Sequence, residues 1–194
     1  MIRRLLLDQH GVTAVEFALL APVLLISLMG CFDLGHNMYT NGMLVGAIQK
    51  TARDSSIEGA SGNEAALDQH VAEVVHAIAP SATLTFTRKA YTNFGDVSQP
   101  EDYTDVNANN ICDNGEPFED ANGNGAWDAD RGSSGFGGAR DAVLYTVDVT
   151  YDRLFPLAGL IGQPPTMTVS AATVLRNQPY GQQGQPAVTQ GACA

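Results

Sequence analysis

Acidic and amide side chains between residues 105 and 116 recur at the spacing of a calcium-binding loop. Side-chain oxygens fall at loop positions 1, 3, 5, 9 and 12, and a backbone carbonyl is available at position 7; the residues are Asp105, Asn107, Asn109, Ile111, Asp113 and Glu116. Calcium prefers about six to eight oxygen ligands, which is what this pattern offers. Glycine is expected at the sixth position, where the chain has Asn110. Asparagine tolerates the left-handed backbone conformation better than most residues do, so we predict a calcium site here.

A second run of the same kind begins at Asp120, shortly after the first. Its candidate ligands are Asp120, Asn122, Asn124, Ala126 and Asp128, with Gly125 at the sixth position. The twelfth position is Arg131, which cannot coordinate a cation, so Asp130 or Glu119 would have to supply the missing carboxylate. The two runs resemble the EF-hand-like loops of exported bacterial proteins. The alternative is a solvated turn region without metal, because Asp, Asn and Gly are also the common turn formers.

The overall charge favours cations over nucleic acid as partners. The 194 residues carry 10 Lys and Arg against 21 Asp and Glu, a formal net charge of -11. Nucleic-acid binding needs a basic face, which this composition does not offer, so we expect no nucleic-acid partner. Carboxylates that converge without a cation repel one another, whereas a bound ion orders the loop. Extracellular modules bind calcium at about 0.1 to 1 mM, which favours a structural role for calcium outside the cell.

A single carboxylate, Glu16, lies inside the most hydrophobic part of the chain. The segment from Val12 to Phe32 has no other charged residue. About 20 apolar residues are enough to cross a bilayer core of roughly 30 Å as a helix. Arg3 and Arg4 precede the segment, which places the N-terminus in the cytoplasm. A carboxylate at this depth costs about 2.5 to 3.5 kcal/mol, so Glu16 needs a partner or a function.

The residues around Glu16 resemble a type IV prepilin cleavage site. Gly11 is followed by four small or apolar residues, then Glu16 and Phe17. The longer run 11–25, with its continuation to Arg53, is similar to the start of a TadE-like minor pilin of the tight adherence (Tad, type IVc) pilus system. The resemblance implies that an inner-membrane prepilin peptidase cuts between Gly11 and Val12. The new ammonium group of one subunit would then neutralise Glu16 of a neighbour in the membrane.

The family implies a minor pilin or pseudopilin. Phe17 replaces the tyrosine that is usual at this place in the major pilins, and the chain length points the same way. The implied partners are other pilin subunits, contacted through the N-terminal helix, the prepilin peptidase and the inner membrane. The implied roles are pilus assembly, priming or tip structure, and surface adhesion. The protein would cross the inner membrane once with its C-terminal domain outside the cytoplasm, and could enter an extracellular pilus.

The cysteines leave an alternative open. Leu28 to Cys31 fits a lipoprotein signal, in which Cys31 would be lipidated and would begin the mature chain. The protein would then be a calcium-binding lipoprotein or a signal-anchored surface protein. Cys112 and Cys193 show no metal-binding spacing and could pair in a disulfide if the domain is exported.

Hydrophobic periodicity predicts an α+β fold, in which a long N-terminal helix precedes a second helix packed on a small, mainly antiparallel sheet. The expected helix is 64–79, and the expected strands are 83–88, 142–152 and 166–176. The predicted organisation is a leader (1–11), a transmembrane helix (12–34), an amphipathic stem helix (35–58), an exported domain (59–176) with an acidic insert at about 91–140, and a flexible tail (177–194).

The sequence shows no recognisable catalytic constellation. It has no Gly-x-Ser-x-Gly, phosphate-loop, His-Glu-x-x-His or dinucleotide-binding motif. His70 and His76 are six residues apart, which puts them on different faces of a helix. We therefore expect neither an enzyme nor a small-molecule substrate.

Overall fold

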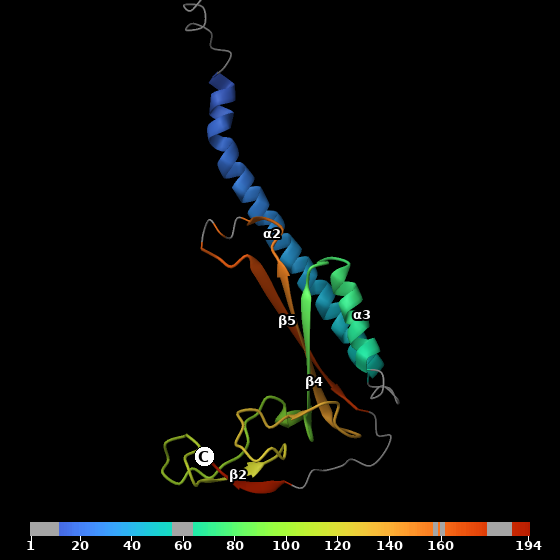
Figure 1. Cartoon of the computed structure of the whole chain (residues 1–194), viewed down its shortest axis with the longest axis vertical. Coiled ribbons are helices and arrows are strands. Elements are labelled where there is room, and N and C mark those ends of the chain that lie inside the picture. The colour runs from blue at the N-terminus through green and yellow to red at the C-terminus, as the bar shows by residue number, and fades with distance from the viewer. Residues whose placement is uncertain (1–11, 56–63, 157–158, 160–161, 178–187) are drawn as a thin grey trace, which may run out of the picture.

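The first described element is one continuous helix, α2 (Val12–Ser55), of 44 residues. The computed structural model describes residues 12–55, 64–156, 159, 162–177 and 188–194, so the predicted leader and the last residues of the predicted stem lie outside the described part. At 1.5 Å per residue the helix is about 66 Å long. Its N-terminal half projects beyond all other described elements (Figure 1). The predicted transmembrane and stem segments therefore form a single rod.

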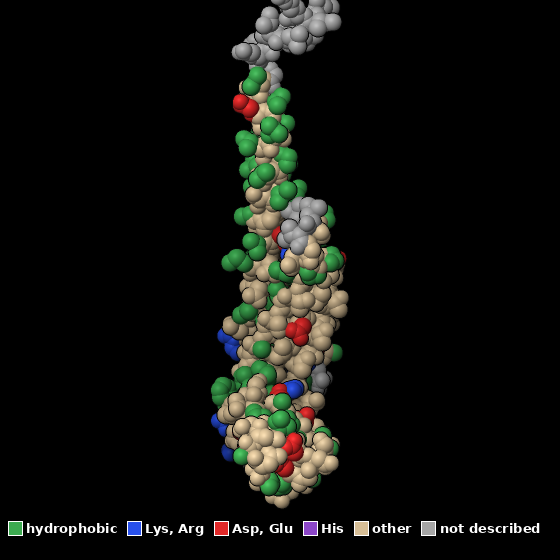
Figure 2. All heavy atoms as spheres, turned by 90° about the vertical axis from the view of Figure 1, so that its left-hand side faces the viewer, with side chains coloured by type: hydrophobic (Ala, Val, Ile, Leu, Met, Phe, Trp, Pro, Cys, Tyr) green, Lys and Arg blue, Asp and Glu red, His purple; other side chains and the backbone are tan. Residues whose placement is uncertain are grey.

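The two halves of α2 have different surroundings. In the N-terminal half, apolar side chains are exposed, as in Leu19 (74%), Leu20 (68%) and Val23 (66%), and Figure 2 shows them on the projecting part of the molecule. In the C-terminal half, Leu44 and Ile48 are buried, with 0% and 1% exposure. Burial of apolar surface therefore holds only the C-terminal half against the domain.

The main sheet is antiparallel with strand order β3-β1-β4-β5. Its strands are β3 (Ser133–Ser134), β1 (Thr83–Tyr91), β4 (Ala142–Asp152) and β5 (Thr166–Arg176). Side chains along β4 alternate between buried and less buried positions, as expected of a strand with one face on a core. The three strands predicted from this alternation are confirmed, and β1 continues to Tyr91.

Both helices bury their apolar sides against this sheet. The second helix, α3 (Glu64–His76), contributes Val71 and Val75, which are fully buried together with Leu44 of α2. The core cluster draws its members from α2, α3, the α3–β1 turn, β4 and β5: Leu44, Ala47, Ile48, Val71, Val75, Ala79, Ala82, Tyr145, Val147, Val149, Tyr151, Val169 and Ala171. The predicted α+β architecture is confirmed.

A polar contact fixes α3 on the sheet. Arg88 of β1 makes a paired salt bridge with Asp68 of α3, and the Tyr145 hydroxyl donates to the same carboxylate at 2.7 Å. The Arg88 guanidinium lies 4.3 Å from the ring centre of Tyr145 and 4.7 Å from that of Phe136. Burial and the Asp68 carboxylate raise the pKa of Tyr145. The hydroxyl therefore stays protonated and keeps donating.

A second, two-stranded sheet pairs β2 (Pro117–Asp120) with β6 (Thr189–Ala192) in antiparallel register. A short 3-10 turn, η2 (Phe94–Asp96), lies upstream of β2. The prediction of a flexible tail from residue 177 is wrong for its last residues, because 189–192 form β6. Gln, Gly and Pro are poor core formers, but here the pairing comes from the backbone and a neighbouring disulfide.

Two leucines on α2 test whether burial of its C-terminal half holds the domain together. Replacing buried Leu44 with Ala should lower the free energy of unfolding by about 2 to 5 kcal/mol, because it leaves a cavity between helix and sheet. The matched change Leu34→Ala, at a site with 63% exposure, should change it by less than about 0.5 kcal/mol. Denaturant unfolding of the detergent-solubilised chain measures both. Equal losses for the two variants would contradict this packing.

Candidate functional site

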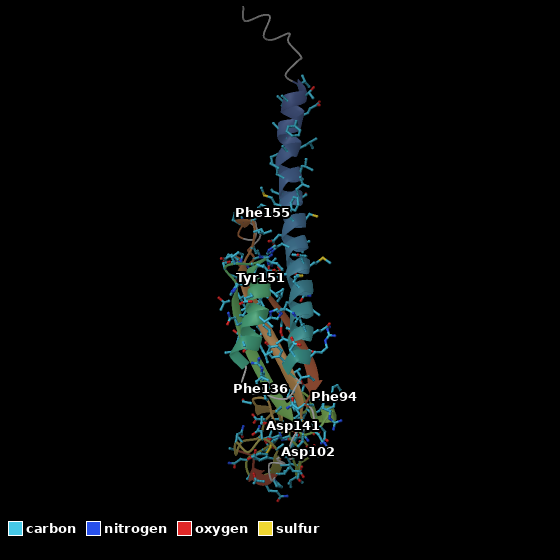
Figure 3. All side chains as sticks on the ribbon, turned by 90° about the vertical axis from the view of Figure 1, so that its right-hand side faces the viewer. Phe94, Asp102, Phe136, Asp141, Tyr151 and Phe155 are labelled. Carbon is cyan, nitrogen blue, oxygen red and sulfur yellow. A yellow bond between two sulfur atoms is a disulfide. The ribbon has the colours of Figure 1, made fainter. Side chains whose placement is uncertain are left out.

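The acidic side chains predicted to bind calcium gather at one end of the molecule. We call residues 93–132 together with 188–194 the acidic lobe. It lies at the end of the sheet opposite the projecting half of α2 (Figure 1). Figure 3 shows Asp102 within it, far from Phe155 near the other end. Strand β2 lies between the two predicted loops and carries Phe118 (2% exposed) into the interior of the lobe.

In the first loop, the side chain of Asp105 organises the backbone. Its carboxylate accepts hydrogen bonds from the N–H groups of Asn109 at 3.2 Å and Asn110 at 2.7 Å. Asn110 has φ 63°, the left-handed conformation expected at the sixth loop position, and Ala108 has φ 61° at the fourth. Asn110 therefore has the left-handed backbone conformation for which glycine is expected at the sixth position.

The second loop repeats this geometry. The Asp120 carboxylate accepts from the N–H groups of Asn124 at 3.1 Å and Gly125 at 2.9 Å, the fifth and sixth positions. Gly123 and Gly125 have φ 76° and 80°, so the fourth and sixth positions are left-handed here too. The two loops therefore have the same backbone path, although only the second has glycines at these points.

The carboxylate at the twelfth position of the first loop closes that loop. Glu116 is buried (6% exposed) and accepts from two loop N–H groups, that of Val106 at 2.8 Å and that of Asp113 at 3.0 Å. These are the second and ninth loop positions. Glu116 therefore joins the start of the loop to its ninth residue.

Glu101 takes the corresponding place in the second loop. Its side chain is 1% exposed and accepts from the N–H of Ala121 at 2.8 Å and that of Asp128 at 3.0 Å, again the second and ninth positions. Sequence reasoning missed Glu101 because it precedes the loop, whereas the motif looks for a carboxylate after it. The one signal in the sequence was the mismatch at Arg131.

Arg131 and Trp127 hold the segment that carries Glu101. The Arg131 guanidinium donates to the carbonyl of Pro100 at 2.6 and 2.9 Å and to the Asp102 carboxylate at 2.8 Å. The Trp127 indole N–H donates to the Glu101 carbonyl at 2.9 Å. The Arg131 side chain, at the twelfth loop position, therefore fixes the segment that supplies the replacing carboxylate, Glu101.

The structure places the two predicted substitutes elsewhere. The Asp130 carboxylate accepts from the Lys89 ammonium at 2.6 Å and the Tyr91 hydroxyl at 2.9 Å, on the side of the main sheet. Burial raises the pKa of Asp130, but Lys89, the N–H of Gly132 and Tyr91 outweigh it and hold the pKa below its usual value. Glu119 is exposed on β2. Neither is among the groups that close the second loop.

The remaining candidate ligands converge in each loop, with their amides in a defined orientation. In the first loop, the side-chain N–H₂ groups of Asn107 and Asn109 both donate to Asp113, at 2.7 and 2.6 Å. Asn122 and Asn124 do the same to Asp128, at 2.8 and 2.5 Å. The amide oxygens accept from loop N–H groups instead, as Asn109 Oδ1 does from Ile111 and Asn124 Oδ1 from Ala126. The partly positive amide N–H₂ groups thus compensate the negative charge of Asp113 and Asp128.

The donor set of each loop is compatible with a hard cation but contains few acids. Among the described residues, no three side chains of His, Cys, Asp or Glu form a group that could hold a metal. Amide and backbone oxygens would therefore have to complete the shell, and a half-turn of each amide exchanges its nitrogen for its oxygen without changing its shape. The residues fit calcium only with that rotation.

Backbone N–H groups help to keep the Asp120 carboxyl charged. Burial raises the pKa of the Asp120 carboxyl, but the N–H groups of Gly125, Gly123 and Asn124 outweigh it and hold the pKa below its usual value. Burial and the nearby Asp105, Glu116 and Asp113 carboxylates raise the pKa of Tyr103. The Asp120 carboxyl therefore stays ionised at neutral pH, as a cation ligand at the first loop position must be.

A disulfide ties the C-terminus to the first loop. Cys112 and Cys193 are bonded, with their Cα atoms 5.6 Å apart and 81 residues between them in sequence. Backbone hydrogen bonds flank the bridge, from Gly115 N–H to the Cys193 carbonyl and from Cys193 N–H to the Glu116 carbonyl, both 2.8 Å. The structure therefore brings together the two cysteines that the sequence offered as a pair.

The other candidate site is the free end of α2. Every described side chain from Val12 to Leu20 is exposed, including Glu16 and Phe17 (64%). Within the described residues, one helix is long and apolar enough to cross a membrane, Val12–Asp54. It is a candidate membrane anchor. Gly11, at the predicted cleavage site, lies outside the described residues.

The N-terminal helix is the part of the chain that resembles known proteins. Residues 11–53 match the family model of TadE-like proteins. This TadE-like segment covers nearly all of α2 and none of the sheet or the acidic lobe. The match supports a TadE-like, pilin-like protein that associates with components of a Tad pilus. No curated protein and no solved structure matches the chain.

Variants of two glutamates in the lobe distinguish the closure of the second loop by Glu101 from a general effect of surface charge. Glu101→Gln keeps the size of the side chain but turns one carboxylate oxygen into a donor that faces a backbone N–H. It should destabilise the lobe by about 1 to 3 kcal/mol. The control Glu119→Gln, at an exposed position on β2, should have little effect. Protection of the Ala121 and Asp128 amides from hydrogen exchange measures the change, and unchanged protection in Glu101→Gln would contradict the role given to Glu101.

Proposed function

We propose that this chain is a minor pilin, or pseudopilin, of a Tad-type pilus. Prepilin peptidase cleaves it after Gly11, and α2 holds it in the inner membrane with the sheet and the acidic lobe outside the cytoplasm. The observation that carries the proposal is the TadE-like match over 11–53, which falls on a helix whose first half exposes its apolar side chains. A helix of this kind needs lipid or neighbouring helices around it.

Glu16 gives the helix a specific partner in this proposal. After cleavage, the ammonium group of Val12 lies one helical turn from Glu16, and in an assembled pilus it lies near Glu16 of an adjacent subunit. A carboxylate in a low-dielectric bundle is costly unless an opposite charge pairs with it. Pairing between subunits therefore favours packing of the helices in register with their neighbours.

The position of the acidic lobe suggests where the subunit acts. The lobe is at the far end of the molecule from the projecting half of α2, so it faces away from the membrane or from the helical core of a fibre (Figure 1). The subunit then contributes to assembly, to priming or to the tip of the pilus, with the lobe as the surface available for adhesion. The proposal contains no catalytic step.

The N-terminal residue of the protein from cells tests the processing. We expect a chain that begins at Val12 when prepilin peptidase is present and an uncut chain when it is absent, measured by intact mass and N-terminal sequencing. Gly11→Val should block the cut, whereas Cys31→Ser should leave it unchanged. A lipid-modified chain that begins at Cys31 would instead identify a lipoprotein and overturn the pilin pathway.

We further propose that each loop of the acidic lobe binds one calcium ion. Glu116 closes the first site, and Glu101 supplies for the second site the carboxylate that Arg131 cannot. Support comes from the same backbone path in the two loops and from the buried carboxylate that, in each loop, accepts from the N–H groups of the second and ninth residues. Calcium would displace the Asn–Asp contacts, with the amides turned so that their oxygens face the ion.

Calorimetric titration of the detergent-solubilised chain with calcium tests this proposal. We expect two binding events with dissociation constants of about 0.1 to 1 mM. Asp105→Ala should weaken one event and Asp120→Ala the other, each by on the order of tenfold or more, because each removes the residue at the first loop position.

The charge-matched control is Asp152→Ala, which changes an exposed residue at the end of β4, outside the lobe, and should leave both events intact. Magnesium should not replace calcium, because it requires a tighter octahedral shell. Absence of any heat at millimolar calcium would refute the calcium sites and leave the minor-pilin proposal standing.

A further inference from the structure

The connection between β4 and β5 has an unusual composition for a loop. From Leu154 to Leu175 the sequence contains no charged residue and no histidine. The connection begins with Leu154, Phe155 and Pro156, and the Leu154 side chain is 52% exposed. Loops that face water on all sides are usually polar at their tips. We therefore expect the exposed start of this connection to contact something less polar than water.

Polar contacts fix the start of the connection against α2. Arg153 Nη1 lies 2.7 Å from Asp33 Oδ2, and the backbone N–H of Leu154 donates to Asp33 Oδ1 at 3.3 Å. The side chains of Arg153 and Asp33 are only 17% and 18% exposed, so each charge is largely covered and paired. Leu154 is thus held at the level of Asp33 along the helix.

Asp33 marks the end of the apolar part of α2. It is the first charged residue after Glu16, and the 21 residues from Val12 to Phe32 make about 31 Å of helix. That length equals the thickness of a bilayer core, roughly 30 Å. A helix that spans the membrane with this segment leaves it at Asp33. Phe32, with 63% exposure, is then the last apolar side chain inside.

The start of the β4–β5 connection lies at the same height along α2 as Asp33. Strand β4 ends and β5 begins at the end of the sheet nearer to the projecting half of α2 (Figure 1). Figure 3 shows Phe155 at this end, beside α2 and beyond Tyr151. The apolar start of the connection and the end of the apolar helix therefore face the same plane.

We propose that the start of the β4–β5 connection is a second membrane contact, in which Leu154 and Phe155 enter the headgroup region and upper acyl chains of the leaflet from which α2 emerges. The proposal rests on the membrane anchoring of α2 proposed above. Phospholipid is the occupant that fits, because Leu154 and Phe155 are apolar and the adjacent Arg153 and Asp33 neutralise each other. A second contact beside the helix fixes how the domain is oriented on the membrane.

Fluorescence quenching by lipids in reconstituted bilayers tests this contact. The full chain with Cys31→Ser carries one added cysteine, Leu154→Cys, labelled with an environment-sensitive dye, while the Cys112–Cys193 disulfide stays oxidised. The bilayers contain phosphatidylcholine with a quencher placed shallow or deep on the acyl chain. The label at residue 154 should lose fluorescence to the shallow quencher and keep it with the deep one.

Three further positions make the result decisive. Gly159→Cys gives a second probe in the connection, since a Cβ there meets no atom within 4 Å. Leu24→Cys, within the apolar segment, should be quenched by the deep label, and Phe94→Cys, in the acidic lobe, by neither. If residues 154 and 159 behave like residue 94 while residue 24 is quenched, the membrane contact is refuted and the anchor stands.

The anchor itself fails if residue 24 is not quenched, and the inference then falls with it. Quenching at residue 154 that appears only at high protein density would assign the surface to a second copy of the chain and would also overturn the proposal. Shallow quenching at residues 154 and 159 that does not depend on protein density supports it.

Discussion

The architecture depends on the burial of one side of the C-terminal half of α2 against the sheet. Leu44, Ile48 and Ala52 are withdrawn from water, and the same rigid helix continues outward with apolar side chains on every side. Because the helix is unbroken, the packing of its C-terminal half decides the direction of its N-terminal half. The direction in which β4 and β5 run relative to the projecting half of α2 follows from that packing. A loss of helix–sheet contact would therefore change how the domain is oriented relative to the projecting half of α2.

The acidic lobe is stabilised by a different balance of forces. It has one large buried apolar side chain, Phe118, and it depends on carboxylates that accept from backbone N–H groups, on the short β2–β6 sheet and on a disulfide. Gly191 belongs to this arrangement, since a Cβ there would lie 2.4 Å from the Phe118 ring. Such a lobe gains little from hydrophobic burial. A cation that replaces amide–carboxylate contacts by ligand bonds would add stability where the core adds least.

The fold could be predicted from the sequence wherever a single hydrophobic periodicity, helical or alternating, extends over a whole helix or strand. Helical and alternating patterns are strong in α2, α3, β1, β4 and β5, because each has one face on the common core. The left-handed conformation of Asn110 could be predicted because the spacing of Asp and Asn residues in the loop is local. Glu101 could not, since it reaches the second loop through a contact distant in sequence. Strand β6 could not either, because backbone pairing and the Cys112–Cys193 bridge define it rather than its side chains.

The path of the chain between sheet and lobe has a mechanical consequence. The lobe is joined to the sheet after β1, before β4 and after β5, and these strands run along the molecule between the helix end and the lobe (Figure 1). Hydrogen bonds in the sheet lie across the strands. A pull on the lobe, away from an anchored α2, would load the bonds between β1 and β4 and between β4 and β5 in shear. Many bonds would then have to break at once, whereas peeling from one end would break them singly, and tension from a surface contact could pass to the helix without unravelling the domain.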